Sequence, residues 1–390
     1  MNTNFDQVVD RKGTNSVKWD LNDRIYGSNE ILPMWVADMD FKAPEVVIEA
    51  LKTQLDHGVF GYTSIPDSTK DAIISWVTNR HNWKLHNEWI SYSSGVVTAM
   101  SSVVQALTQP GDKIVVQTPI YPPFFQLIER NKRELITSEN KLVNSSYEMD
   151  FDDLEQKLTK DVKVFMLCNP HNPGGKVWSS QDLKKLGELC LKNNILILSD
   201  DIHSDILIGE KPYTPIASLS DELAQQTITF IAPTKTFNIA GLQASVIITP
   251  NKSLKVKIDN FQSAQGFFTL NTMGIVGMEA AYGKGEPWFE NLLSYLKENL
   301  QRLESFLKEQ LPMIKLIKPD ASYLAWLDLR ELGLSDEQIK KLLVEKGKLG
   351  LEPGPKYGKG GEGFVRINLG CPKETLEEGL RRLKIAFGDL

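Results

Sequence analysis

The sequence predicts an α/β fold in two parts, a large domain built on a mostly parallel sheet sandwiched by helices and a smaller α+β domain. The chain has 390 residues, more than the roughly 250 to 300 residues that one hydrophobic core holds. Between residues 44 and 249, short valine- and isoleucine-rich runs alternate with amphipathic stretches, the pattern of buried parallel strands joined by crossover helices. After residue 271 the pattern becomes one long amphipathic stripe, which indicates a long helix that opens the second domain.

Five apolar runs predict strands of the large domain. Each is short and rich in branched residues, and several of the intervening segments are long enough for a crossover helix. The runs cover residues 113–116, 162–167, 195–198, 228–231 and 246–248. Within residues 179–192, Leu183, Leu186, Leu189 and Cys190 fall on one helical face, so this segment predicts one of the crossover helices.

The elements of the smaller domain follow the long helix, whose apolar stripe runs from Phe289 to Leu311 and stops at Pro312. Two further strands and a closing helix are predicted at residues 323–327, 364–369 and 375–387. The N-terminal residues lack a core of their own, so we expect them to pack on the smaller domain. The predicted division is an N-terminal segment (residues 1–45), a large domain (residues 46–275) and a small domain (residues 276–390).

Composition argues against several classes of function. A net charge of −6 and a pI near 5.6 give nucleic acid and anionic membrane surfaces no long-range attraction. No segment approaches the roughly 18 consecutive apolar residues of a membrane span, and the N-terminus lacks the pattern of a secretory signal. Cys168, Cys190 and Cys371 are too scattered for a disulfide framework, and the histidines show no metal-ligand spacing. We expect a cytoplasmic protein that binds no metal.

Polar residues gather where two predicted strands end. Residues 169–175 (NPHNPGG) follow one strand directly, and Asp200, Asp201 and His203 follow the next. Ligands of open α/β sheets bind at the carboxyl ends of the strands. The alternatives are a plain turn for the first segment and an acidic helix cap for the second, although a cap accounts for one aspartate better than for two.

A lysine follows the next strand among small and apolar neighbours. Lys235 lies in residues 232–242 (APTKTFNIAGL), where desolvation would lower the pKa of its amine and make it a nucleophile toward an aldehyde. A surface lysine beside a turn is the commoner fate of a lysine, but the apolar context favours the reactive group.

Together, Asn172, Asp200 and Lys235 follow successive strands in that order, and this arrangement resembles the fold-type I pyridoxal-phosphate enzymes of the aminotransferase class I/II superfamily. The resemblance covers nearly the whole chain and implies a seven-stranded sheet. It further implies that Lys235 carries pyridoxal phosphate as a Schiff base, that Asp200 pairs with the pyridine nitrogen and that Asn172 contacts the phenolic oxygen. His203 stands where many relatives have a tyrosine that meets the same oxygen.

Other positions match the cofactor site of that superfamily. Residues 93–97 open an amphipathic helix, and the amide groups at a helix N-terminus attract a phosphate. The resemblance implies that Val96, Val97 and Thr234 bind the phosphate and that Tyr121 stacks on the cofactor ring. Taken alone, the glycine at the helix start and the loop tyrosine would be ordinary features.

Two further positions match residues that bind the substrate or the cofactor of the neighbouring subunit. Arg366, in a predicted strand, matches the arginine that clamps the substrate carboxylate, a task suited to a guanidinium fork. Tyr62 matches a tyrosine that reaches the phosphate of the neighbouring subunit. The resemblance therefore implies a homodimer with shared active sites.

The N-terminus and the lysine motif resemble one branch of the superfamily, the MalY/PatB-type cystathionine β-lyases. Many aminotransferases carry an arginine eight residues after the lysine, whereas this chain has Gln243. Residues 18–20 (KWD) and 34–40 (MWVADMD) match the opening pattern of the branch. By position, the backbone around Ala37 should face the substrate carboxylate.

The expected reaction is β-elimination of cysteine S-conjugates, with cystathionine yielding homocysteine, pyruvate and ammonia. Lys235 would act as the base that removes the α-proton. The first alternative is an aminotransferase with the same cofactor geometry. The second, of another class, is a regulator that binds a transcription factor through its surface.

Overall fold

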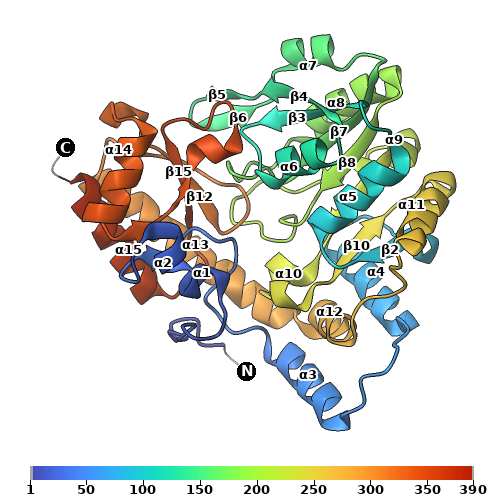
Figure 1. The fold of residues 1–390 in the computed structure, drawn as a ribbon, viewed down its shortest axis with the longest axis horizontal. Coiled ribbons are helices and arrows are strands. Elements are labelled where there is room, and N and C mark those ends of the chain that lie inside the picture. Colours follow the sequence, from blue (N-terminus) through green and yellow to red (C-terminus); the bar gives the residue numbers. More distant parts are fainter. Residues whose placement is uncertain (1–2, 389–390) are drawn as a thin grey trace.

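A seven-stranded sheet forms the centre of the larger part of the molecule (Figure 1). The computed structural model describes residues 3–388. In spatial order the strands are β2 (Ile90–Ser93), β10 (Ser245–Ile248), β9 (Thr227–Ile231), β8 (Leu196–Asp200), β7 (Val162–Cys168), β3 (Lys113–Thr118) and β4 (Glu134–Glu139). Neighbours from β9 to β4 run parallel, and β10 runs antiparallel to β9 and β2. The predicted fold class is confirmed.

The five predicted strands are all present, and the structure adds β2 and β4, which the apolar pattern does not predict. Both lie at the edges of the sheet. β4 has the sequence ELITSE with only Ser138 fully buried, and β2 has the sequence ISYS. β4 is only partly covered, so it lacks the continuous run of branched residues that marks a central parallel strand. β2 is mostly buried, but serine and tyrosine occupy three of its four positions, so no apolar run marks it either.

Helices cover both faces of the sheet because alternate strand residues point to opposite sides. Ile114 and Val116 pack on one side, and Val115 and Leu167 pack on the other. The helices of the first side are α5 (Val96–Leu107), α6 (Pro123–Arg130) and α11 (Lys252–Ala264), and those of the second are α7 (Phe151–Lys157), α8 (Ser180–Asn193) and α9 (Asp221–Gln226). The crossover helix predicted at residues 179–192 is α8.

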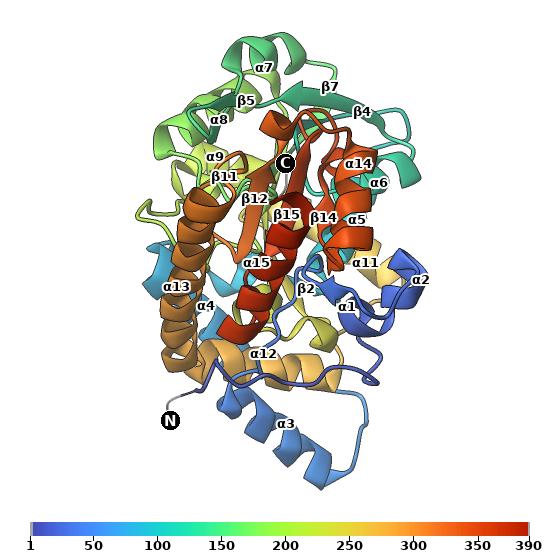
Figure 2. The ribbon, with the colours of Figure 1, turned by 90° about the vertical axis from the view of Figure 1, so that its left-hand side faces the viewer.

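A second sheet of four antiparallel strands lies in the C-terminal part. Its spatial order is β11 (Lys315–Ile317), β12 (Leu324–Asp328), β15 (Phe364–Asn368) and β14 (Glu352–Pro353). The helices that accompany it are α13 (Glu286–Gln310), α14 (Asp336–Lys341) and α15 (Lys373–Phe387). Figure 2 shows α13 and α15 side by side across this sheet. The predicted long helix, both strands and the closing helix are therefore present.

The N-terminal segment lies against this smaller sheet. Its elements are α1 (Val17–Asp20), α2 (Asn22–Tyr26) and β1 (Leu32–Pro33), and β1 pairs in parallel with β13 (Leu349–Gly350). The amide of Asn368 then donates to the carbonyl of Met34 at 2.9 Å. The predicted domain limits at residues 45 and 275 stay a prediction.

The other α-helices and strands flank or extend these parts. They are the helices α3 (Glu45–His57), α4 (Asp67–His81), α10 (Pro233–Thr236) and α12 (Thr272–Lys284) and the hairpin strands β5 (Lys141–Val143) and β6 (Ser146–Glu148). Across residues 3–388, no helix combines the length and the apolar character needed to cross a membrane.

Candidate active site

Three neighbouring parallel strands bring their carboxyl ends to one cavity. β7 ends at Cys168, directly opposite Asp200 at the end of β8, and β9 leads into α10, which carries Lys235. Asn172, Asp200 and Lys235 all line a cavity of about 170 Å³, called here the inner cavity. The structure thus brings together the three residues that the sequence places after successive strands.

The amine of Lys235 is buried, hydrogen-bonded to the backbone and close to two carboxylates. Its Nζ donates a hydrogen bond of 2.5 Å to the carbonyl of Ala37. Desolvation lowers the pKa of Lys235 from 10.5 to about 8, against the opposing charges of Asp38 and Asp200. Because the neutral amine is the nucleophile and the base, this shift makes Lys235 far more reactive near neutral pH than an exposed lysine.

The lowered pKa of Lys235 predicts the pH dependence of cofactor capture by protein freed of cofactor. Below pH 8 the neutral fraction of the amine falls about tenfold for each pH unit. The rate of the absorbance change on mixing with pyridoxal phosphate should therefore rise steeply from pH 6 and level off above pH 8. N-acetyl-lysine, as the control, should continue to gain rate toward pH 10. A protein rate that also climbs to pH 10 would contradict the assignment.

Asp200 is a buried carboxylate with little compensation. It is 4% exposed, and within residues 3–388 its side chain accepts one hydrogen bond, from the amide of Ile202 at 3.2 Å. Burial raises the pKa of Asp200 to about 7, although Lys235 opposes the shift. A cationic partner inside the inner cavity would stabilise the ionised form.

The neighbouring carboxylate does not belong to this cavity. Asp201 accepts hydrogen bonds from the hydroxyl of Ser199 at 2.5 Å and from that of Tyr213, and it lines a separate small cavity on the other side. Adjacent residues at a strand end point to opposite faces. The sequence pairs the two aspartates at one edge, and the structure leaves only Asp200 facing the site.

The end of the inner cavity next to α5 is suited to an anion. Ser94, Val96 and Val97 line it at the start of this helix, where unpaired amides and the helix dipole favour negative charge. A side chain at Gly95 would meet no atom within 4 Å, so the backbone there borders open space. Thr234 lines the same cavity.

Few positively charged side chains line the end of the inner cavity next to α5. Gln243 lines the inner cavity at the position where many aminotransferases have an arginine. Among the described residues that line the cavity, Lys235 is the one strongly basic group. The protein would therefore hold a phosphate chiefly through amides and hydroxyl groups.

His203 and Tyr121 complete the walls of the inner cavity. Burial lowers the pKa of His203 to about 3, with Lys235 and Arg366 lowering it further, so its ring is neutral. Its Nδ1 lies 3.1 Å from the hydroxyl of Ser322, a partner that the sequence does not predict. Tyr121 also lines the adjoining cavity, described next.

A larger outer cavity of about 530 Å³ adjoins the inner one and shares Ala37, Tyr121 and Lys235 with it. Arg366 lines the outer cavity and is 4% exposed. It donates to the side-chain oxygen of Asn172 at 3.0 Å and to the carbonyl of Trp35 at 3.0 Å, while its Nε has no partner within residues 3–388. A buried guanidinium without a carboxylate partner is suited to bind one from a ligand.

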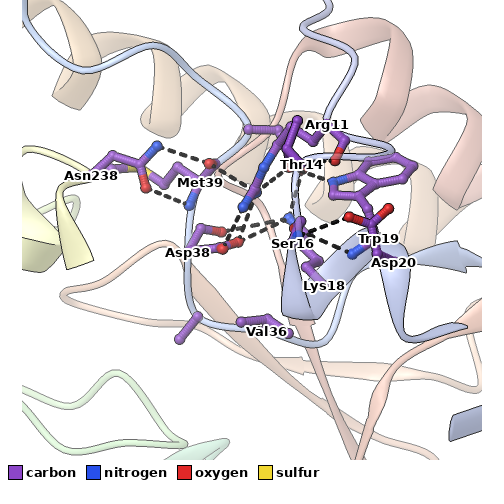
Figure 3. A network of polar contacts seen from close by, with 12 residues as sticks. Arg11, Thr14, Ser16, Lys18, Trp19, Asp20, Val36, Asp38, Met39 and Asn238 are labelled. Carbon is purple, nitrogen blue, oxygen red and sulfur yellow. Dashed lines mark hydrogen bonds and ion pairs between the residues drawn. The ribbon is translucent and has the colours of Figure 1, made fainter. Parts of the chain in front are cut away.

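The backbone of residues 35–39 crosses the site and is held from several sides (Figure 3). The carbonyl of Ala37 accepts hydrogen bonds from Lys235 and from the hydroxyl of Tyr323 at 2.8 Å. Asn238 pairs with both the amide and the carbonyl of Met39, at 2.9 and 2.8 Å. Asn368 donates to two further carbonyl groups of the segment. The segment therefore links the lysine helix to the smaller sheet.

A buried ionic cluster supports the same segment. Asp40 accepts hydrogen bonds from Lys18 at 2.6 Å, Arg11 at 2.7 Å and the indole of Trp19 at 2.9 Å. Arg11 also pairs with Asp38 at 2.7 Å. Apart from Arg11, these residues come from the two N-terminal motifs that resemble the lyase branch, and their contacts explain why those motifs occur together.

Removing the cation of Lys18 should destabilise the protein. Lys18 is 1% exposed, and a buried ion pair that loses one partner leaves an uncompensated charge. We expect Lys18→Met to lower the free energy of unfolding by about 3 kcal/mol, measured by urea titration. The loss is at the low end for a buried pair because Arg11 remains beside Asp40. Lys52→Met, at an exposed pair with Glu49, is the control and should leave stability unchanged within error. Equal stability of the two variants would contradict the role of the cluster.

Tyr62 is the predicted site residue that the structure does not bring to either cavity. Its side chain is fully exposed, and Val59 and Phe60 beside it are 65% and 58% exposed. These apolar side chains lie in the connection between α3 and α4. The segment therefore projects apolar surface that the chain itself leaves uncovered.

The observed residues fit pyridoxal phosphate. Asp200 lacks the cation that a protonated pyridine nitrogen would provide, and the start of α5 offers amides to a phosphate. Lys235 offers an amine of lowered pKa to an aldehyde. Tyr323, Ser322 and Trp35 are site residues that sequence reasoning missed, and only Trp35 carried a signal, as part of the MWVADMD motif.

Comparisons with known proteins agree with this geometry. The profile of the aminotransferase class I and II family matches residues 29–383. Cystathionine beta-lyase PatB of Bacillus subtilis is 51% identical over 385 residues, which cover 98% of this chain and all of that protein. Cystalysin of Treponema denticola, which contains a pyridoxal 5'-phosphate cofactor, superposes with a TM-score of 0.97 at 34% identity over the full length of both chains. The PLP-bound C-S lyase of Staphylococcus hominis superposes with a TM-score of 0.92 at 33% identity, covering 99% of this chain and 98% of that one.

Proposed function

Because the chain belongs to the aminotransferase class I and II family, in its MalY/PatB-type branch, we propose that it is a pyridoxal-phosphate-dependent lyase. The enzyme cleaves the carbon–sulfur bond of cysteine S-conjugates, with cystathionine as substrate. The observation that carries this proposal is the position of Lys235. Its amine lies where the two cavities meet, with Asp200 lining the inner one and Arg366 lining the outer one.

Each residue has a task that follows from its contacts. Bound pyridoxal phosphate supplies an electron sink for the negative charge that develops at the substrate's α-carbon. Asp200 would hold the proton on the pyridine nitrogen, because a buried carboxylate favours a cationic neighbour. Arg366, oriented by Asn172, would bind the substrate's α-carboxylate through its unpartnered Nε.

Lys235 would move the protons. Its neutral Nζ removes the α-proton and then delivers a proton to the departing sulfur, which breaks the bond between the β-carbon and sulfur. Hydrolysis of the remaining fragment gives pyruvate and ammonia, and cystathionine releases homocysteine. The carbonyl of Ala37, which accepts from the free Nζ at 2.5 Å, would orient the amine for these proton transfers. Val96, Val97 and Thr234 would bind the phosphate and Tyr121 would cover the ring, with His203 beside the phenolic oxygen.

The direct test is to incubate purified holoenzyme with cystathionine and other cysteine S-conjugates and to measure pyruvate and thiol together. We expect both products in equal amounts. An aminotransferase would instead convert the cofactor to its pyridoxamine form with an amino acid and recover on addition of a keto acid. That result, without pyruvate release, would overturn the proposal.

We further propose a homodimer in which Tyr62 of each subunit reaches the phosphate site of the other. The exposed Val59, Phe60 and Tyr62 support this, because a dimer interface would cover them. We place the protein in the reducing cytoplasm, since Cys168 and the other two cysteines are unpaired.

Shared sites predict rescue between two inactive variants. In a heterodimer of Lys235→Ala and Tyr62→Ala subunits, one site carries both changes and the other carries neither. Mixing the two variants under subunit-exchange conditions should therefore restore half of the wild-type activity per heterodimer, measured as pyruvate release. If each site uses its own Tyr62, every site keeps one defect and no activity returns.

A further inference from the structure

The outer cavity has a polar wall that the proposed reaction does not use. A separate apolar cavity of about 300 Å³ lies behind it, against α2, α14 and the smaller sheet. Trp35, Glu352 and Lys356 are the described residues that line both cavities. Arg366 also lines the outer cavity, so this wall borders space beside the residue proposed to bind the α-carboxylate.

Glu352 stands directly beside the residue proposed to bind the α-carboxylate. It lies on β14 opposite Arg366 on β15, and residues directly opposite one another on paired strands project from the same face of the sheet. Neighbouring strands are about 4.8 Å apart. Arg366, Glu352 and Lys356 thus follow one another outward from the site along one wall.

The two members of the ion pair on this wall differ in burial. Lys356 donates to Oε1 of Glu352 at 2.9 Å, and the side chain of Glu352 is 11% exposed whereas that of Lys356 is 54% exposed. Within residues 3–388, Lys356 is the one hydrogen-bond partner of that carboxylate. A nearby pair of the same spacing, Lys341 and Glu345, has side chains that are 70% and 66% exposed and lines neither cavity. The covered carboxylate of Glu352 therefore has room for a second cationic partner, which would offset the cost of its burial, and the half-exposed ammonium group of Lys356 is open to an anion.

We propose that Glu352 and Lys356 form a subsite for a zwitterionic amino-acid group at the distal end of the substrate. The carboxylate of Glu352 accepts hydrogen bonds from the distal ammonium group, and the ammonium group of Lys356 binds the distal carboxylate. The proposal rests on the proposed function, because it assigns the far half of a cysteine S-conjugate. It selects conjugates of the cystathionine type over simple S-alkyl cysteines.

Binding of two unreactive ligands to the holoenzyme tests the subsite. The first is the carbon analogue of cystathionine, in which a methylene group replaces the sulfur, and the second is the same molecule with a methyl group in place of the distal amino-acid group. Calorimetry should show at least about tenfold tighter binding of the first ligand to the wild type. Glu352→Gln and Lys356→Met should each reduce this preference about tenfold.

Matched variants separate recognition from structure. Glu345→Gln and Lys341→Met, at the exposed pair, should keep the wild-type preference. Glu352→Asp and Lys356→Arg retain the charges and should keep most of it, and the melting temperature of each variant reports its folding. Equal affinity of the wild type for both ligands, or tighter binding of the methyl-ended one in the apolar cavity, would overturn the subsite.

Pyruvate release from cystathionine is measured separately from ligand binding, so the two proposals can fail independently. A wild type that prefers the zwitterionic ligand but releases no pyruvate from cystathionine contradicts the proposed function and leaves the subsite standing. A wild type that releases pyruvate but binds both ligands equally contradicts the subsite alone.

Discussion

Lys235→Ala is expected to lower pyruvate release from cystathionine at least about 10⁴-fold. The variant loses the amine that donates to the carbonyl of Ala37, and with it both the covalent attachment of the cofactor and the group that moves the α-proton. Steady-state pyruvate assays with saturating pyridoxal phosphate measure the loss. Borohydride treatment followed by mass spectrometry should fix the cofactor to the wild-type chain and leave the variant unmodified.

A second lysine provides the control for this experiment. Lys176 is half-buried, its pKa is lowered by burial, and it donates to Ser146 at 2.8 Å, but it lines neither the inner nor the outer cavity. Lys176→Ala should keep both activity and labelling. Labelling of Lys235→Ala at another lysine, with activity retained, would refute the assignment.

Asp200→Ala is expected to lower kcat about 10³-fold. Within the described residues, the side chain of Asp200 makes one hydrogen bond, with the amide of Ile202, so its removal leaves the protein's own hydrogen bonds almost unchanged. The expected loss comes instead from the pyridine nitrogen, which would no longer be held protonated. The dissociation constant of pyridoxal phosphate should rise as well, because the cofactor loses its ionic partner in a buried site.

Asp201→Asn is the matched control for Asp200. Both carboxylates are buried, and burial raises the pKa of each to about 7, but Asp201 faces Ser199 and Tyr213. The control variant should lose stability and retain kcat. If Asp201→Asn abolished the reaction while Asp200→Ala spared it, the roles of the two residues would have to be exchanged.

The sequence predicts that Asn172, Asp200 and Lys235 lie together, as they do in the inner cavity, because its signals are local. Asn172, Asp200 and Lys235 each follow a buried strand, and parallel strands bring their carboxyl ends to one edge. The difference between Asp200 and Asp201 was also within reach, since adjacent residues at a strand end point to opposite faces. The edge strands β2 and β4 were not, because β4 is partly exposed and β2 has serine or tyrosine at three of its four positions, so neither shows an apolar run.

Contacts between distant segments were beyond sequence reasoning. The hydroxyl of Tyr323 and the carbonyl of Ala37 are 286 positions apart in the chain, and Asn368 reaches residues 36 and 38 across a similar separation. Neither side chain has a local feature that marks it. Glu352 likewise gains its place in the outer cavity only from pairing of β14 with β15. Such residues depend on how the smaller sheet docks on the N-terminal segment.

The backbone of residues 35–39 has a consequence for changing the substrate range by mutation. Arg366 donates to the carbonyl of Trp35 and Lys235 donates to the carbonyl of Ala37. One short peptide therefore orients both the residue proposed to bind the α-carboxylate and the lysine proposed to act as the base. A substitution that displaces this peptide would alter affinity and turnover at once, and selection could not improve one without disturbing the other. The side chains on β14 and the turn after it make no hydrogen bond to that peptide within residues 3–388. Libraries aimed at new thiol leaving groups should therefore vary Glu352 and Lys356 and leave residues 35–39 intact.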